Sequence, residues 1–437
     1  MPDLLSNALA FIFALGVIIF VHEAGHLLVA KYFDMRVLTF SLGFGKRLWG
    51  FERGGTDYRV SLVPLGGYVR LGGEDPTEST EDPRDFLNKP RWQRILVYLA
   101  GPAMNIVLSI VLIAVLFMVG IQVPMLQNIE PLVGLVAEGS AGEAAGVLAG
   151  DRVVAVDGEA TTSWEDVQFA LMTSPEREVL LTIERGGARF DVDVTPAMVE
   201  KYEFGDAGLF PVYLPRVTQI FGDSPAEAAG FRVGDEIRSV DGRPISDSAA
   251  FVEVIQDSPG RPVDVGVMRD NSEMTLSVIP DGPLGEARIG IGLGVLQRYG
   301  PVQALTESVK YNVDIARQTF AVIGKIFTGQ LGARSISGPI EIAAMSGAAA
   351  RTGLRNLLYL MGLISISIAL LNLMPIPMLD GGQIFVLLIE SVRQRDLSLR
   401  VKERIQQVGF YMIVMLMVVV LYFDLVKNLP EGLLPGS

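Results

Sequence analysis

The chain contains no cysteine, and only two of its 437 residues are histidine. The absence of cysteine excludes a disulfide framework and every zinc site that depends on thiolate ligands. The scarcity of histidine confines any imidazole-based metal site to one place, because His22 and His26 lie four residues apart. A zinc site in this chain would therefore have to combine this pair with carboxylates.

Positive charge is scarce in one long segment. Residues 124–300 contain 13 Lys and Arg against 29 Asp and Glu, a net charge of −16, while the whole chain carries −13, so the remainder carries +3. An acidic segment of this size argues against nucleic-acid binding. Because 50% of all residues are hydrophobic, we expect membrane segments in addition to a sizeable soluble part.

The two histidines enclose Glu23 in the string H-E-A-G-H at residues 22–26. On a helix, residues i and i+4 lie on one face, so both imidazoles can bind one Zn²⁺ while Glu23 acts as a general base. Between residues 4 and 30 these are the only three ionisable side chains. Ionisable groups are costly inside a membrane and indicate function there. A chance match to the motif is the alternative, and the apolar setting favours the metal site.

Four apolar segments are long enough to cross a membrane, which takes about 20 helical residues. They are residues 4–33, 95–123, 357–374 and 408–426. Ten Lys and Arg lie between residues 34 and 94, and five lie between residues 393 and 404. By the positive-inside rule these loops are cytoplasmic, and both termini and the acidic segment are outside, in the periplasm of a bacterium. The histidine pair then lies toward the cytoplasmic side of the inner membrane.

The acidic segment is a tandem repeat. Residues 140–158 and 224–242 are identical at 10 of 19 positions, with an offset of 84. Short β-type runs between Gly-Asp and Asp-Gly turns, with one helix per copy near residues 163–172 and 247–256, predict two small α+β domains. The string A-A-G-x-x-x-G-D-x-x-x-x-V-D-G, present in both, resembles bacterial PDZ domains, which bind extended peptides at a sheet edge. Domains that act only as spacers are the alternative.

A further candidate ligand follows the third apolar segment, in N-L-M-P-I-P-M-L-D-G-G at residues 372–382. The two prolines lack amide protons and disfavour helix just before them, so the helix should break around residues 374–377 and restart through residue 389. Asp380 lies just past the break and can be the third zinc ligand, which leaves the open position of a catalytic site. Alternatively, Asp380 is only the N-cap of the next helix. We favour the ligand, because the chain offers no other His or Cys.

Together these motifs resemble the site-two protease family of intramembrane zinc metalloproteases over essentially the whole chain. The string G-P-A-M-N at residues 101–105 is similar to the G-P-x-x-N motif of that family. The resemblance implies that zinc is bound by His22, His26 and Asp380, and that Glu23 is catalytic. It places three further residues near the substrate strand, namely Asn372, Asn105 and Pro375. Gln383 departs from the family pattern, where relatives carry histidine, and this puts an accessory role of that position in doubt.

The resemblance also implies a substrate class. Members of the family act in regulated intramembrane proteolysis, cleaving single-span membrane proteins that have already been trimmed on the periplasmic side. An anti-sigma factor of the envelope stress response and remnant signal peptides are the expected substrates. The expected partners are therefore such substrates, the lipid bilayer, and peptide or protein ligands of the PDZ pair.

Two further segments are expected to help present a substrate. Residues 37–45 and 58–71 alternate apolar with small or polar residues, which predicts a hairpin. We interpret it as re-entrant, dipping toward the membrane so that an unwound substrate can pair with its edge; an ordinary cytoplasmic hairpin is the alternative. Residues 301–331 place apolar side chains on one broad face, which predicts a helix on the outer membrane surface, followed by a linker to residue 353.

The predicted fold is membrane α-helical, with four transmembrane helices and a membrane-re-entrant β-hairpin, joined to two periplasmic α+β PDZ domains at residues 124–213 and 214–300. The predicted function is that of a zinc endopeptidase. A non-proteolytic PDZ scaffold and a divalent-metal transporter are the alternatives. The scaffold needs neither Glu23 nor the histidine pair, and the transporter needs the ligands but no general base.

Overall fold

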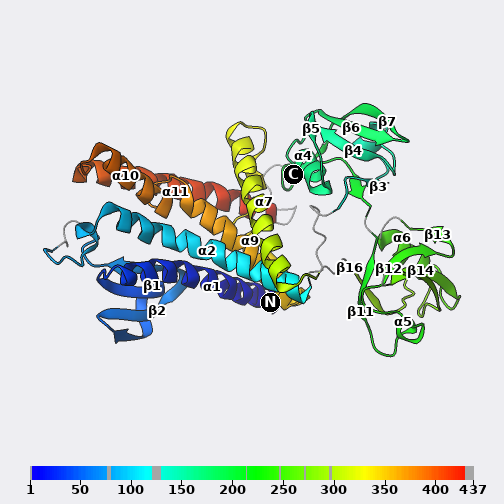
Figure 1. Cartoon of the computed structure of the whole chain (residues 1–437), viewed down its shortest axis with the longest axis horizontal. Coiled ribbons are helices and arrows are strands. Elements are labelled where there is room, and N and C mark those ends of the chain that lie inside the picture. Colours follow the sequence, from blue (N-terminus) through cyan, green and yellow to red (C-terminus); the bar gives the residue numbers. More distant parts are fainter. Residues whose placement is uncertain are drawn as a thin grey trace. The chain divides into compact units, whose positions relative to one another are not determined.

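The computed structural model describes residues 2–75, 80–120, 129–212, 214–245, 248–269, 272–294 and 298–428. The chain divides into two compact units, called here the helical unit and the repeat unit. The helical unit comprises Met1–Met118, Tyr299–Ala321 and Ile336–Ser437, and the repeat unit comprises Val119–Arg298 and Val322–Ser335. Most of the long helices belong to the helical unit, and most of the strands belong to the repeat unit (Figure 1). This division follows the contrast between apolar and acidic segments in the sequence.

The helical unit contains four helices that are long and apolar enough to cross a membrane. They are α1 (Pro2–Tyr32), α2 (Arg91–Val119), α9 (Leu354–Leu373) and α11 (Leu399–Asn428). The expected number of apolar helices is therefore confirmed, but several ends differ. Helix α2 begins at Arg91 rather than at residue 95, and α9 begins at Leu354 rather than at residue 357. Helix α2 stops at Val119 rather than at residue 123, and α11 begins at Leu399 rather than at residue 408. The first turns of α11 carry charged side chains, so a search for apolar runs passes over them.

A helix between residues 301 and 353 was missed by the sequence interpretation. Helix α7 (Pro301–Phe327) is the predicted one, although it ends before residue 331. Helix α8 (Pro339–Thr352) occupies the expected linker and packs against α1, α9 and α11. The buried carboxylate of Asp424 in α11 accepts hydrogen bonds from the first backbone N–H groups of α8, at 2.7 Å from Ile340 N and 3.1 Å from Glu341 N. A side chain of one helix thus satisfies the free N-terminus of another.

The predicted hairpin is longer and more folded than expected. Strands β1 (Val37–Arg53) and β2 (Thr56–Leu71) pair antiparallel. Residues 39–42 of β1 pair with residues 67–70 on one side and with residues 57–60 on the other, so two bent strands build a sheet four strands wide. One edge of that sheet is formed by residues 67–71, which we call the edge strand.

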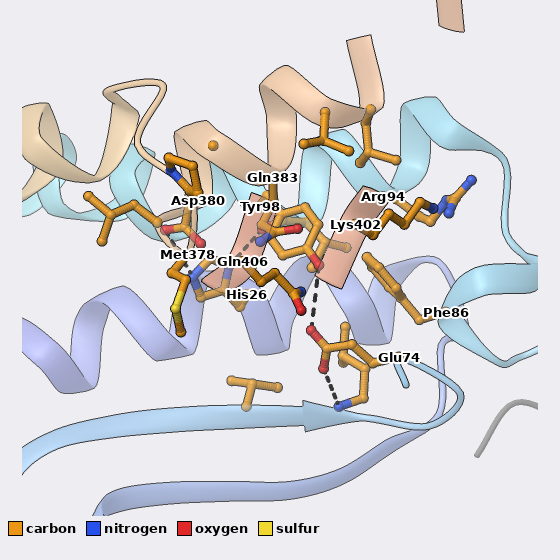
Figure 2. A pocket seen from close by; sticks show the side chains of 18 of the residues that line it. His26, Glu74, Phe86, Arg94, Tyr98, Met378, Asp380, Gln383, Lys402 and Gln406 are labelled. Atoms are coloured by element: carbon orange, nitrogen blue, oxygen red, sulfur yellow. Dashed lines mark hydrogen bonds and ion pairs between the residues drawn. The ribbon is translucent and has the colours of Figure 1, made fainter. Parts of the chain in front are cut away.

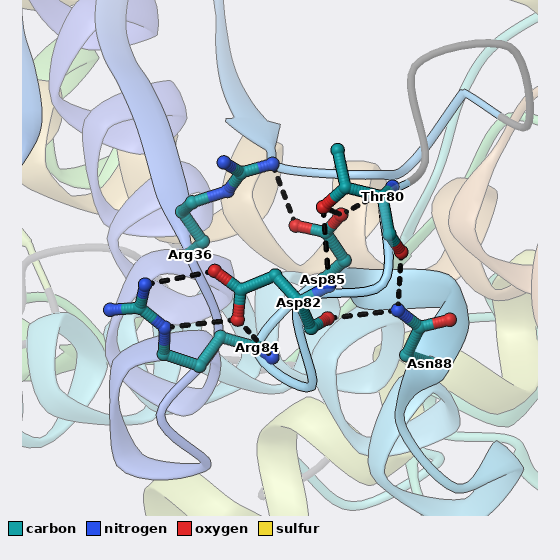
Figure 3. A network of polar contacts seen from close by, with 6 residues as sticks. All are labelled: Arg36, Thr80, Asp82, Arg84, Asp85 and Asn88. Carbon is teal, nitrogen blue, oxygen red and sulfur yellow. Dashed lines mark hydrogen bonds and ion pairs between the residues drawn. The ribbon is translucent and has the colours of Figure 1, made fainter.

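A polar network pins the loop that follows the edge strand (Figure 3). Asp85 is fully buried, accepts a hydrogen bond of 2.7 Å from the Thr80 hydroxyl, and lies 2.7 Å from a guanidinium nitrogen of Arg36. Asn88 donates to the backbone carbonyls of Thr80 and Asp82, at 2.8 Å each. These contacts hold the loop in one conformation as the chain turns back toward α2.

The two copies of the repeat share one order of elements, except that the first has two additional short strands, at residues 197–199 and 204–206, among the described residues. The first contains β3 (Val133–Val136), α3 (Ala141–Ala144), β4 (Arg152–Val156), β5 (Glu159–Ala160), α4 (Trp164–Met172), β6 (Val179–Arg185), β7 (Ala188–Val194), β8 (Ala197–Val199), β9 (Phe204–Asp206) and β10 (Leu209–Pro211). The second contains β11 (Arg216–Ile220), α5 (Pro225–Ala228), β12 (Glu236–Val240), β13 (Arg243–Pro244), α6 (Ser248–Gln256), β14 (Val263–Arg269), β15 (Ser272–Val278) and β16 (Ile291–Gly294). The expectation of one helix per copy is wrong, because each copy also has a four-residue helix, α3 or α5.

The duplication extends to individual contacts. Buried Asp151 pairs with Arg185 at 2.6 Å, and buried Asp235 pairs with Arg269 at 2.7 Å, each at the offset of 84. In both copies the arginine also donates to a glycine carbonyl, at 2.8 Å in the first and 2.9 Å in the second. The short helices likewise begin at equivalent serine N-caps. The sequence repeat is therefore a structural repeat.

Candidate metal centre

Three side chains from two distant parts of the sequence converge in the helical unit. Oδ2 of Asp380 lies 3.2 Å from Nε2 of His22 and 3.5 Å from Nε2 of His26, and the two Nε2 atoms are 3.2 Å apart. Figure 2 shows Asp380 beside His26. Two ligand atoms that each lie about 2.0–2.1 Å from a tetrahedral zinc are about 3.3 Å from one another. The spacing and the donor set of two imidazoles and one carboxylate therefore fit a zinc ion with one coordination position open.

The break after α9 brings Asp380 to the histidines. Helix α9 ends at Leu373 and α10 (Asp380–Arg393) begins seven residues later, as the two prolines predict. Met378 in the break has φ of 77°, a left-handed conformation that residues other than glycine rarely adopt. The N-cap of α10 is Leu379, and no side chain caps this helix end. Asp380 is therefore not the N-cap, and its carboxylate lies against the histidines instead.

Glu23 lies between the three candidate ligands and the edge strand. It is half-buried, and its carboxylate takes a hydrogen bond from the backbone of Val69. A Cβ atom on Gly67 would lie only 3.0 Å from Cγ of Glu23. The absence of a side chain at Gly67 thus lets the edge strand approach the glutamate closely.

A cavity of about 460 Å³ contains this cluster and extends along α2, α10 and α11. Among its polar lining residues are Glu74, Arg94, Tyr98, Glu390, Lys402 and Gln406. Figure 2 shows several of them on the far side of the cavity from Asp380. The Tyr98 hydroxyl donates to Glu74 at 3.5 Å, and the Lys402 ammonium lies 2.7 Å from buried Glu390. Sequence reasoning missed these residues; the available signal was that charged side chains flank the apolar segments.

The three residues expected near a substrate occupy different places. Asn372 lines the cavity and is half-buried. Pro375 is exposed on the break after α9 and is not among the residues that line the cavity. Asn105 is fully buried and also does not line the cavity; its side-chain amide lies 3.3 Å from Nδ1 of His22. Gln383, the departure from the family pattern, lies on the cavity wall.

Comparison with known proteins connects this arrangement with a group of proteases. A family model described as Peptidase family M50 matches residues 10–416. Proteins named regulator of sigma-E protease RseP from Salmonella typhimurium and from Escherichia coli are each 31% identical, over 97% of this chain and 99% of their own lengths. A Vibrio cholerae protein named as a zinc metalloprotease is 30% identical, over 98% of this chain and 100% of its own length. The similarity covers nearly the whole of the chain, including both units.

Proposed function

The chain belongs to peptidase family M50, the site-two proteases, and from that membership we propose that it is a zinc endopeptidase that cleaves its substrates within the membrane. The observation that carries the proposal is the convergence of His22, His26 and Asp380 beside Glu23. Helix α1, which holds His22, Glu23 and His26, is long and apolar enough to cross a bilayer, and so is α9, which ends seven residues before Asp380. Such a location suits hydrolysis of a peptide bond that is buried in lipid.

The chemistry requires one proton acceptor from the chain. The two histidines and Asp380 would hold a zinc ion, whose Lewis acidity would lower the pKa of a water molecule toward neutrality and polarise the scissile carbonyl. Glu23 accepts the proton of the attacking water as the new C–O bond forms. Glu23 then donates this proton to the leaving nitrogen as the C–N bond breaks, which yields one carboxyl and one amino terminus.

The edge strand supports a mode of substrate binding. A transmembrane helix hides its carbonyl groups in internal hydrogen bonds, so the substrate must unwind before attack. Residues 67–71 form a sheet edge beside Glu23, to which an unwound segment can add as a further strand. Asn372 lines the same cavity, and its side-chain amide can both donate to and accept from the freed backbone. In this proposal Pro375 contributes by holding the break that exposes the site.

Exposed side chains and charge support the membrane placement. The sheet of β1 and β2 exposes large apolar side chains, among them Leu48, Trp49, Phe51, Leu62 and Val63. Exposed apolar patches of this kind mark membrane or protein contact sites, and they suit a sheet that dips toward the membrane. With the basic loops in the cytoplasm, the site lies toward the cytoplasmic side of a bacterial inner membrane and the repeat unit lies in the periplasm. Residues 429–437, expected as a periplasmic tail, lie outside the described residues.

Helix α7 supports the same placement. Val309, Val313, Phe320 and Phe327, all on its predicted apolar face, are exposed. An exposed apolar row of this length suits a helix that lies on the membrane surface. The relatives named regulator of sigma-E protease are linked by that name to sigma E, which supports an anti-sigma factor as a substrate of this chain. The wider class of trimmed single-span proteins is proposed from family membership.

The test uses the purified full chain in detergent with a single-span model substrate. Glu23→Gln should lower cleavage by about 10²–10⁴-fold, the usual contribution of a general acid–base group, while bound zinc remains at the wild-type level. Asp380→Ala should lose zinc and cleavage together, and a chelator should stop the wild-type enzyme. Glu52→Gln, at an exposed position in β1, is the matched control and should leave both unchanged.

The same measurements separate the alternatives. Full cleavage by Glu23→Gln would refute the mechanism, and wild-type zinc content in Asp380→Ala would refute the ligand assignment. A scaffold would show no cleavage by the wild-type chain. A transporter would move zinc across a vesicle membrane at a rate that Glu23→Gln does not change.

A further inference from the structure

One face of helix α2 lies against both histidines. Val97, Gly101 and Asn105 follow one another at intervals of four residues and so lie on one side of the helix. The carbonyl oxygen of Val97 is 2.7 Å from Nδ1 of His26, and the side-chain amide of Asn105 is 3.3 Å from Nδ1 of His22. Val97 therefore contacts His26, and Asn105 contacts His22, in each case at Nδ1. Nε2, the other ring nitrogen, faces Asp380.

The middle residue of this face leaves room for the ligand atoms. A Cβ atom on Gly101 would lie 2.3 Å from Nε2 of His26 and 2.8 Å from Nε2 of His22. No side chain other than hydrogen fits there while the two nitrogens keep their positions. Helix α2 therefore contacts each imidazole twice, through a hydrogen bond at Nδ1 and through a close approach at Nε2.

The contact at Val97 fixes the protonation of His26. A backbone carbonyl can only accept, so Nδ1 of His26 must carry the proton and donate it. A neutral imidazole carries one N–H, which leaves Nε2 of His26 with a free lone pair for a metal. Because Nε2 of His22 also faces Asp380, Nδ1 of His22 must carry the proton in the same way, and it needs an acceptor.

We propose that Asn105 is that acceptor, and hence a positioning residue for the zinc ligand His22; this inference rests on the proposed zinc site. In the present orientation the amide Nδ2 of Asn105 faces His22, while Oδ1 is buried and has no hydrogen-bond partner in the described part of the chain. Turning the amide by half a turn places Oδ1 opposite Nδ1 of His22. This change supplies Nδ1–H of His22 with an acceptor and gives the buried Oδ1 a donor, while Nδ2 takes the place that Oδ1 leaves.

The surroundings of Asn105 favour this role over contact with a substrate. Asn105 is fully buried and does not line the cavity that contains Glu23. Its backbone carbonyl accepts a hydrogen bond of 2.9 Å from the Ser365 hydroxyl, which ties α2 to α9 at this point. A side chain held in this way can orient a neighbouring imidazole with little freedom of its own.

The first test measures zinc affinity of the full chain in detergent by competition with a chromogenic chelator. Asn105→Ala should bind zinc about 10–100-fold more weakly, the usual effect of removing a group that orients a histidine ligand. Asn105→Asp should bind within threefold of wild type or more tightly, because a carboxylate also accepts from Nδ1–H. Ser109→Ala is the matched control; it removes a buried hydrogen bond of 2.6 Å to Asn312, one turn further along α2, and should not change zinc affinity.

A spectroscopic test reads the tautomer directly. Because the chain has only two histidines, labelling with ¹⁵N-histidine and a histidine-free purification tag gives signals from two rings alone. In the zinc-bound protein both rings should carry the proton on Nδ1, and Asn105→Ala should alter the Nδ1 signal of His22 but not that of His26. The Nδ1 signal of His26 serves as the internal reference, because its acceptor, the Val97 carbonyl, is unchanged in this variant.

Each outcome decides a separate point. Wild-type zinc affinity in Asn105→Ala, or an equal loss in Asn105→Ala and Asn105→Asp, would overturn the positioning role of Asn105. An effect of Asn105→Ala on substrate KM alone would assign this residue to the substrate strand. If the wild-type chain itself binds no zinc, the proposed function fails, which is a different result from either of these.

Discussion

At the scale of single residues, the two histidines are held from opposite sides. Asp380 contacts Nε2 of both rings from beyond the α9 break, and α2 contacts Nδ1 of each ring. A ring whose Nδ1 is held by α2 keeps its Nε2 lone pair directed at the metal position, which lowers the cost of assembling the site. This explains why two histidines in an apolar helix can be a stable arrangement rather than a defect.

Gly101 gives a prediction at this scale. Gly101→Ala should reduce zinc occupancy strongly, because the added methyl group would overlap the position of Nε2 of His26. Helix propensity alone predicts the opposite effect, because alanine is favoured over glycine within a helix by about 1 kcal/mol. A loss of zinc would therefore point to the contact with the histidines. Gly16→Ala in α1 is the matched control, since a Cβ atom there meets nothing within 4 Å. Metal analysis and thermal unfolding of the two purified variants would check this, and full zinc content in Gly101→Ala would contradict it.

The sequence was sufficient to predict which residues form the cluster but not what orients them. The spacing of His22 and His26 and the proline break before Asp380 identify the group that the structure brings together. The Val97 contact could not be predicted, because a backbone carbonyl has no side-chain signature. Asn105 was assigned to the substrate by resemblance alone, and only its burial and its distance to His22 indicate the positioning role.

At the scale of elements, the helices were predicted well where they are uniformly apolar and poorly where they are not. The start of α11 was missed because its first turns are charged, although Lys402 there pairs with buried Glu390 of α10 at 2.7 Å. Helix α8 was missed because its small residues give little apolar periodicity. The width of the sheet was underestimated, because each strand bends and pairs twice. Alternation of residue types along a sequence does not reveal a second pairing partner.

The buried ion pair of the first repeat gives a prediction at this scale. Asp151 is 1% exposed, and burial alone would raise the pKa of its carboxyl. The hydrogen bonds from Arg185 and from the Leu148 backbone outweigh burial and hold this pKa below its ordinary value of 3.8. A lowered pKa stabilises the folded state above the pKa of the unfolded chain, and this contribution is lost as the pH falls through the folded value.

Arg185→Ala should therefore lower the free energy of unfolding of the first repeat at pH 7 by about 1–3 kcal/mol. The difference from wild type should shrink as the pH falls through the lowered pKa of Asp151 in the folded state, where its carboxyl becomes protonated. Urea unfolding followed by the fluorescence of buried Trp164, with Trp49 and Trp92 replaced by Phe, would measure it. Arg189→Ala, at a side chain that is 70% exposed, should change stability by less than about 0.5 kcal/mol. If both variants lowered the free energy of unfolding equally, the proposed contribution of the Asp151–Arg185 pair would be refuted.

At the scale of the whole molecule, composition alone separated the two units. The acidic segment of residues 124–300 corresponds to a repeat unit whose strands, β3 to β16, lie between residues 133 and 294. The helical unit is continuous across this insertion, because Tyr299 N donates to Phe117 O at 2.9 Å. The insertion therefore leaves and re-enters the helical unit at neighbouring points.

This geometry permits a clean test of what the repeats do. We expect the repeat unit to exclude substrates that still carry a bulky periplasmic domain, so the full chain should cleave a trimmed substrate much faster than an untrimmed one. Deletion of residues 126–298 leaves residues 120–125 to connect two points that are already adjacent, so the helical unit should still bind zinc and cleave the trimmed substrate. The deletion variant should also cleave the untrimmed substrate.

Cleavage rates for both substrates, measured with the full chain and the deletion variant, decide the matter. Removal of one copy only, residues 214–298, should give an intermediate ratio of rates if exclusion depends on the bulk of the repeat unit. A ratio as high as in the full chain would show that the first copy alone suffices. If the complete deletion cleaves the trimmed substrate but still rejects the untrimmed one, discrimination lies in the helical unit, and the repeats would have to serve partners other than the substrate.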